Sequence, residues 1–284
     1  MTAVLGAFTG QWLKLVKRPA VRILAALLMV ILIGLGYLLG WLITSHLKQF
    51  GGTPPRGETT AQLVAAFHPR QFLTTTVQGT GGLGSVLVLI LGALMMGSEY
   101  GWGTMKTAFT QRPGRLQVLA GWLLALAAVV AILAAIFLAV GAACSVLLGL
   151  IDRAALDFPP PAEVGKGFLV LYLTWGWAAM FGLALAVAFR QSALALGIGL
   201  AEVLVLESLV FGILTPIGGE RLRAVERFFP GPNGAAFTQW LGSPTGAPPA
   251  TPVASVGQAA LVLGLYVVAA IALSAVILRR RDEI

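Results

Sequence analysis

Long apolar stretches alternate with shorter polar segments along the chain. A helix needs about 20 apolar residues to cross the hydrocarbon core of a bilayer, and six stretches meet that requirement. Prolines lie between these stretches or at their margins, as expected for helices, because proline removes a backbone hydrogen bond. The pattern predicts an all-α membrane protein with six transmembrane helices. The predicted spans cover about 21–45, 72–97, 117–149, 167–189, 192–214 and 257–278.

The first 20 residues have a different pattern. Apolar residues recur there at helical spacing and basic residues gather toward the end, which is typical of an amphipathic helix lying at a membrane interface. We predict an interfacial N-terminal helix over 1–20 and a six-span domain over 21–284; the alternative for 1–20 is a polar leader. The apolar positions of the predicted helix are Val4, Leu5, Phe8, Trp12 and Val16.

An uncharged region precedes the last apolar stretch. No charged residue occurs from Phe228 to Leu278, and the part before the last stretch contains aromatic residues among glycines and prolines. It is too broken to cross the bilayer alone and too apolar for a solvated loop. We predict an outer re-entrant segment that packs against the helices, with Phe229, Pro230 and Asn233 as its marked residues.

Composition agrees with a membrane protein, and the charges predict an orientation. The chain is 58% hydrophobic and 11% charged, more apolar than a soluble domain. The net charge of +8 is spread over the ends of the apolar stretches, which argues against nucleic-acid binding. Basic residues are denser on the side of the N-terminus, so both termini are predicted to be cytosolic, in a cytoplasmic membrane. The cytosolic set is Lys14, Lys17, Arg18, Arg22, Lys106, Arg112, Arg115, Arg190 and Arg279 to Arg281.

Few residues indicate chemistry. No Gly-x-x-x-x-Gly-Lys-Ser/Thr loop occurs, and the Gly-x-Gly-x-x-Gly match at 79–84 opens an apolar stretch, which favours close helix packing over nucleotide binding. The same holds for Gly36 and Gly40. The single cysteine, Cys144, excludes an intrachain disulfide. The histidines at 46 and 68 are assigned no metal. No cluster of nucleophile, base and orienting group indicates an enzyme.

Glu202 and Glu207 are the ionisable residues that lie deep in an apolar stretch. A carboxylate at mid-bilayer costs about 3 kcal/mol, so each should face the bundle or a wet cavity. Five residues on an α-helix place the two side chains about 140° apart, which argues against one paired site. Two interpretations stay open: a substrate contact or proton relay, or a protonated group in an interhelical hydrogen bond.

Residues 97–115 form a polar, glycine-containing connection between two apolar stretches, and their length and composition indicate a docking surface. Their motif order resembles the first cytosolic loop of type-2 ABC exporter permeases, whose members also have six spans, an interfacial N-terminal helix and a long outer region. Gly101 departs from the family, in which a basic residue often follows the tyrosine. The matching residues are Glu99-Tyr100, Gly103-Thr104, Arg112-Pro113 and Arg115, with Phe229-Pro230, Asn233, Ala235 and Ala236 in the outer region.

The resemblance implies a division of labour. Two cytosolic ABC ATPase subunits would bind and hydrolyse ATP, and this chain would hold no cofactor directly. A second permease subunit, identical or related, would complete the pathway within the lipid bilayer. Movement would pass through a short helix with Met105, Phe109 and Arg112 on one face; the alternative is a simple interfacial linker helix. The coupling residues would be Glu99, Tyr100, Gly103, Thr104, Met105, Lys106, Phe109, Arg112 and Arg115.

Two other functions stay open at this point. One is an ion-coupled secondary transporter that uses Glu202. The other is a membrane scaffold or sensor component without transport. The sequence does not indicate a cargo for any of the three functions, because every span is apolar for the sake of the bilayer.

Overall fold

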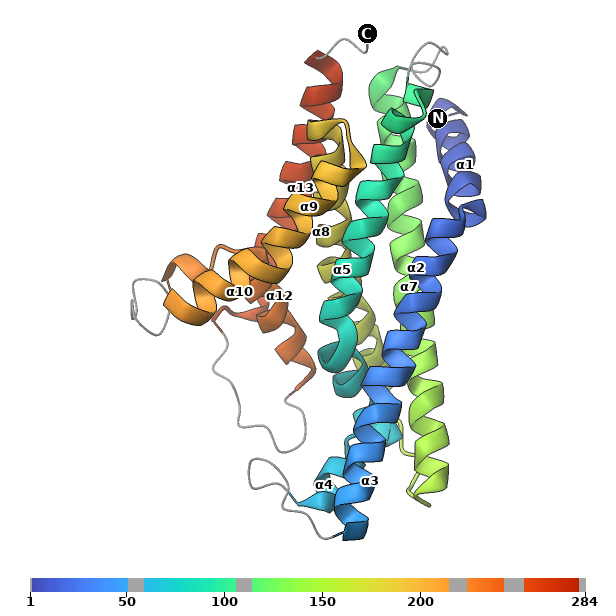
Figure 1. Ribbon diagram of the computed structural model, residues 1–284, viewed down its shortest axis with the longest axis vertical. Helices are drawn as coiled ribbons and strands as arrows, with labels where there is room; N and C mark the ends of the chain where they lie inside the picture. The colour runs from blue at the N-terminus through green and yellow to red at the C-terminus, as the bar shows by residue number, and fades with distance from the viewer. Residues whose placement is uncertain (1, 51–58, 106–113, 215–223, 243–252, 281–284) are drawn as a thin grey trace.

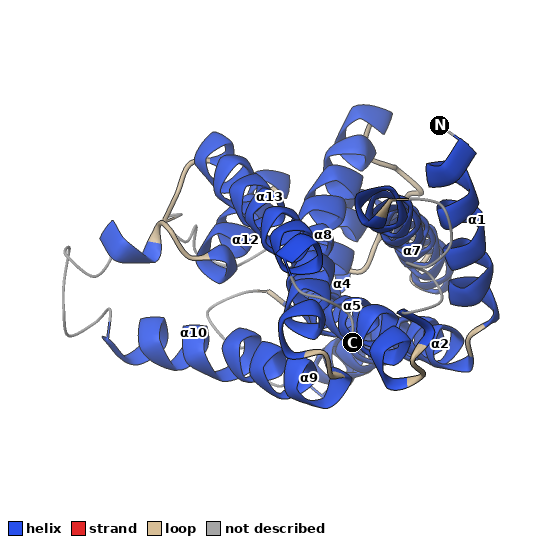
Figure 2. Ribbon diagram, turned by 90° about the horizontal axis from the view of Figure 1, so that it is seen from above, coloured by secondary structure: helices blue, strands red, loops and turns tan. Residues whose placement is uncertain are grey.

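The computed structural model describes residues 2–50, 59–105, 114–214, 224–242 and 253–280. These residues form helices joined by short connections, with no strand in the described ranges (Figures 1 and 2).

Five helical segments of the described chain are long and apolar enough to cross a membrane, so the chain is a multi-pass membrane protein. The segments are Pro19–Leu47, Pro69–Gly101, Arg115–Ile151, Pro161–Phe189 and Val256–Arg280. Figure 1 places the C-terminal ends of the second and the last of them near the same end of the molecule as the N-terminus. The elements that form these segments are α2 (Pro19–Ile31), η1 (Leu32–Leu39), α3 (Gly40–Phe50), η3 (Pro69–Gln71), α5 (Phe72–Gly101), α7 (Arg115–Ile151), α8 (Pro161–Phe189) and α13 (Val256–Arg280).

The fifth predicted span, 192–214, differs from the prediction. Its apolar helix, Ser192–Leu206, is shorter than the five others, and it tilts away from the bundle in Figure 1. Two π-helical turns interrupt the regular hydrogen bonding of this segment. The prediction of six spans is therefore confirmed for five stretches, and the remaining one is a short, irregular apolar helix. Its elements are α9 (Ser192–Ala201), η4 (Glu202–Leu206), α10 (Glu207–Leu209) and η5 (Val210–Leu214).

Helices α5 and α8 form the centre of the bundle, and glycines let them approach closely. A side chain at Gly92 would meet the backbone carbonyl of Ala179, and one at Gly182 would meet that of Leu89. The Trp175 indole donates to the carbonyl of Gly81 at 3.0 Å. The glycine-rich match at 79–84 thus lies inside a helix, and its Gly81 and Gly84 face α8, as the sequence indicated for small residues that let helices approach closely.

The first long segment uses its glycines in the same way. Gly36 faces Thr80 of α5, and Gly40 faces the ring of Phe67. Between them, the Tyr37 hydroxyl is buried and makes a 2.8 Å hydrogen bond with the Thr76 hydroxyl. The small residues of this segment therefore pack against the chain itself.

The predicted N-terminal helix is present as α1 (Thr2–Lys17) and lies along α7 (Figures 1 and 2). A Cβ at Gly121 of α7 would lie 2.6 Å from the Cβ of Ala7, so the two helices nearly touch. The buried face differs in part from the predicted one: Gln11 and Leu15 are buried, whereas Leu5 and Val16 are exposed. The packing of α1 on α7 selects a face that periodicity alone did not identify.

Asp152, the residue after α7, links α7 to α3 and to the connection that precedes η3. Its carboxylate accepts from the Trp41 indole at 3.1 Å and lies 3.2 Å from His68 Nε2. The predicted re-entrant segment contains the short helix α12 (Pro230–Thr238), which packs against α8 and α13. The remaining short elements are α4 (Thr60–Ala65) and η6 (Gln239–Leu241).

Candidate functional site

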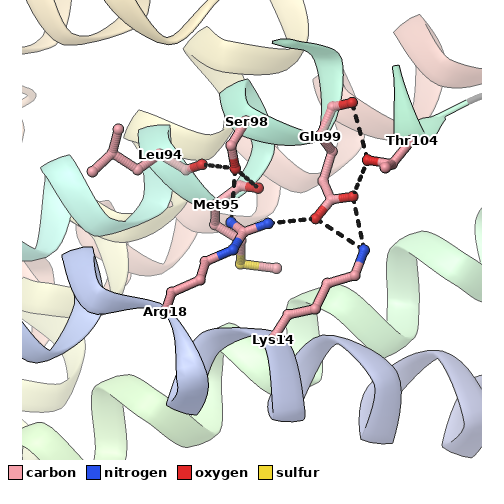
Figure 3. A network of polar contacts seen from close by, with 7 residues as sticks. All are labelled: Lys14, Arg18, Leu94, Met95, Ser98, Glu99 and Thr104. Atoms are coloured by element: carbon pink, nitrogen blue, oxygen red, sulfur yellow. Dashed lines mark hydrogen bonds and ion pairs between the residues drawn. The ribbon is translucent and has the colours of Figure 1, made fainter. Parts of the chain in front are cut away.

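Glu99, at the end of α5, lies at the centre of a polar network (Figure 3). Its side chain is fully buried, with 0% exposure. Lys14 Nζ lies 2.9 Å from one carboxylate oxygen, and Arg18 Nη2 lies 2.7 Å from the other. A buried carboxylate is costly unless it is paired and hydrogen-bonded, and both conditions are met here. Glu99 therefore fixes the end of α1 to the end of α5.

Arg18 makes two further contacts that hold it in place. Its Nη1 donates to the Ser98 hydroxyl at 2.7 Å, and its guanidinium lies 4.7 Å from the centre of the Trp102 ring. The planar guanidinium suits this combination of a carboxylate, a hydroxyl and an aromatic face. Arg18 also precedes Pro19 in extended backbone, which separates α1 from α2. The position thus ends one helix and anchors it to α5.

The connection that follows α5 folds back onto the same carboxylate. Gly103 has a φ of +68°, a conformation that glycine adopts without steric cost, and it turns the chain after Trp102. The turn lets the Thr104 hydroxyl bond the Glu99 carboxylate and lie 3.2 Å from the Glu99 carbonyl oxygen. Three segments therefore meet at one buried acid: the end of α1, the end of α5 and the start of the connection.

The predicted coupling residues divide into inward and outward groups. Glu99 is fully buried, Thr104 bonds its carboxylate, and Met105 is 2% exposed. Arg115 reaches another helix, donating to the Leu278 carbonyl at 3.2 Å near the end of α13. Lys106, Phe109 and Arg112 fall outside the described residues. Exposed positions of the described connection are Gly101, Trp102, Gly103 and Gly114.

The two intramembrane acids predicted from the sequence, Glu202 and Glu207, are arranged differently from the expectation that they lie apart. The carboxyl groups of Glu202 and Glu207 lie close enough to interact with each other, although an α-helix would hold them about 140° apart. The reason is η4: a π-helix repeats its hydrogen bonds at i→i+5, which brings residues five apart onto one face. The expectation that the two acids do not form one site is wrong.

A cavity of about 400 Å³ lies beside this carboxyl pair. It is bounded by α5, α8, η4 and the predicted re-entrant helix α12, and Glu207 lines it. Gly231 of α12 faces the Glu207 carboxylate so closely that any side chain there would collide with it. Pro230 lines the cavity too, whereas Asn233 is buried and donates to the carbonyls of Arg227 and Phe229 at 2.8 and 2.7 Å.

Sequence reasoning missed several residues of both sites. Lys14 and Arg18 carry a signal that could identify them, because two basic residues four apart share one helix face; the sequence analysis assigns them to the interfacial helix and to membrane orientation, and not to Glu99. Trp177 and Gln78, which line the cavity, carry no comparable signal because they lie in long apolar helices.

No model of a known protein family matches the chain, and no curated protein matches it.

Proposed function

We propose that this chain is the transmembrane permease subunit of an ATP-driven exporter of the type-2 ABC class. It would lie in the cytoplasmic membrane with both termini cytosolic, paired with a second permease subunit and two cytosolic ATPase subunits. The ATPase subunits would bind ATP, and this chain would supply the path for the cargo. The motif order of residues 97–115 and of the outer region supports this proposal, and so do five spanning helices, the separate α1 and the short helix α12.

The observation that carries the proposal is the network around Glu99. A partner that pushes on the connection after α5 would act through Thr104 on a carboxylate that also holds Lys14 and Arg18. Force at the connection would thereby reach α1 and α5 together, and α5 packs against α8 at the centre of the bundle. Such an arrangement suits transmission of movement from a partner to the spanning helices.

The proposed contact surface is narrower than the sequence suggested. Met105 packs in the core, so in this conformation its side chain is not available to a partner. Trp102 is 64% exposed at the same connection. The ATPase subunit would then contact the connection around Gly101 and Trp102, together with Phe109 and Arg112 as proposed from the sequence.

Site-specific cross-linking tests this proposal. In a Cys144→Ala background, Gly101→Cys places a thiol at an exposed position where a Cβ meets no heavy atom within 4 Å. We expect cross-linking in native membranes to attach an ATPase that contains a nucleotide-binding loop. Gly165→Cys is the control: it is exposed, a Cβ there also meets nothing within 4 Å, and it lies near the start of α8 at the other end of the bundle. Equal capture at both positions, or none at Gly101→Cys, would contradict the proposal.

A second candidate is an ion-coupled secondary transporter, favoured by the neighbouring acids Glu202 and Glu207, of which Glu207 lines the cavity. It predicts that transport stops when the proton gradient is dissipated and continues after ATP depletion. The exporter proposal predicts that ATP depletion stops transport.

A further inference from the structure

The cavity beside Glu207 has the dimensions and boundaries of a ligand site. Its volume of about 400 Å³ falls within the range of small-molecule sites, about 300–1,000 Å³. Two helices of the central bundle, α5 and α8, form one side, and η4 and α12 form the other. The cavity therefore lies where the irregular helical segment and the short helix α12 meet the regular bundle.

Glu207 supplies the acidic side chain among the described residues that line this cavity, whereas Glu202 lies outside that lining. The Glu207 carboxylate lies against Gly231 of α12, which also lines the cavity. A carboxylate in an apolar site is costly unless it is paired, and a cation in the cavity would pair with it.

The other residues that line the cavity suit a cation that carries apolar substituents. Among the described residues that line the cavity there is no lysine or arginine. Trp177 lines it with an aromatic ring that also packs against Tyr266 at 5.5 Å, and such a ring attracts cations. Apolar side chains such as Val77, Leu171 and Val203 cover much of the remainder.

We propose that this cavity binds a lipophilic monocation, an organic ammonium or phosphonium ion with apolar substituents. Glu207 would pair with the charge, and Trp177 and the apolar lining would hold the substituents. Binding itself is independent of any ATPase subunit; the further statement that such ions are the cargo rests on the proposed permease function.

Binding of tetraphenylphosphonium to the full chain in lipid nanodiscs tests the inference, with empty nanodiscs as background. We expect saturable binding that weakens at least about tenfold in Glu207→Gln, because the cation then loses its charged partner; tenfold corresponds to about 1.4 kcal/mol. Gly234→Leu should also abolish binding, because Gly234 lines the cavity and a Cβ there has only an ordinary contact with Thr174 at 3.8 Å. Glu163→Gln, an exposed carboxylate at the start of α8, is the matched control and should bind like the unchanged chain.

Tetraphenylborate, with the same shape and the opposite charge, separates charge recognition from simple apolar binding; it is titrated alone, because the two ions combine into an insoluble salt. The inference predicts that the anion does not bind saturably. Equal binding of the anion, unchanged tetraphenylphosphonium binding in Glu207→Gln and Gly234→Leu, or no saturable binding of tetraphenylphosphonium would each overturn it, the first by showing that the cavity does not recognise charge. Failure of this assay leaves the Gly101→Cys cross-link unaffected, so the two proposals can fail separately.

Discussion

Replacing Lys14 and Arg18 together by methionine is expected to lower the free energy of unfolding by about 3–5 kcal/mol. The two substitutions remove both cations from a carboxylate with 0% exposure, and among the described residues they leave Thr104 as its bonded side chain. A buried charge without its counterions is among the largest costs that a substitution can create. Unfolding in mixed detergent micelles, followed by tryptophan fluorescence, measures the change.

A matched pair of variants separates this effect from general loss of positive charge. Lys17→Met with Arg22→Met removes two exposed cations from the same region and should change stability by less than about 1 kcal/mol. Adding Glu99→Leu to the first pair should restore most of the lost stability, because no buried charge is then stranded. Equal destabilisation by the two pairs, or no recovery with Glu99→Leu, would show that the network does not hold α1 to α5.

Gly92→Ala is expected to lower the free energy of unfolding by about 3 kcal/mol. A methyl group at this position would collide with the backbone carbonyl of Ala179, which cannot turn away as a flexible side chain could. Helices α5 and α8 would have to separate along the contact that also includes Gly182 against Leu89. The same micelle titration measures the loss, and reduced yield of folded protein should accompany it.

The control for this variant lies in the same helix. Gly79→Ala adds the same methyl group to α5 at an exposed position where nothing lies within 4 Å. Alanine favours a helix over glycine by up to about 1 kcal/mol, so this variant should be as stable as the unchanged chain or slightly more stable. If both variants lose stability equally, the close approach at Gly92 is not what holds the two helices together.

The spanning helices could be predicted from the sequence because their length and lack of charge are properties of continuous stretches. Five of the six stretches satisfy the length criterion in the structure. The stretch 192–214 does not, and it differs from the five others by carrying two acids, Glu202 and Glu207, within its apolar run. Apolar content alone cannot report where a helix changes its hydrogen-bond spacing, since that depends on what the helix packs against.

In the candidate sites, the local sequence marked the acidic residues, but it did not reveal which residues contact them. Glu99 stood out in the sequence because it ends an apolar stretch, but its partners lie 85 and 81 positions away, so its inward direction could not be read from spacing. Glu202 and Glu207 were separated by a calculation that assumes a regular α-helix. Their proximity follows from one π-helical turn, which no residue pattern in this stretch predicts.

ATP hydrolysis by material purified from native membranes through an affinity tag on this chain tests the central claim most directly. The proposed permease function predicts that an ATPase subunit copurifies and hydrolyses ATP. It also predicts that Glu99→Gln lowers the rate by about tenfold, equivalent to about 1.4 kcal/mol, whereas Glu163→Gln does not. Preparations that contain the folded chain but hydrolyse no ATP, even after cross-linking through Gly101→Cys, would contradict it.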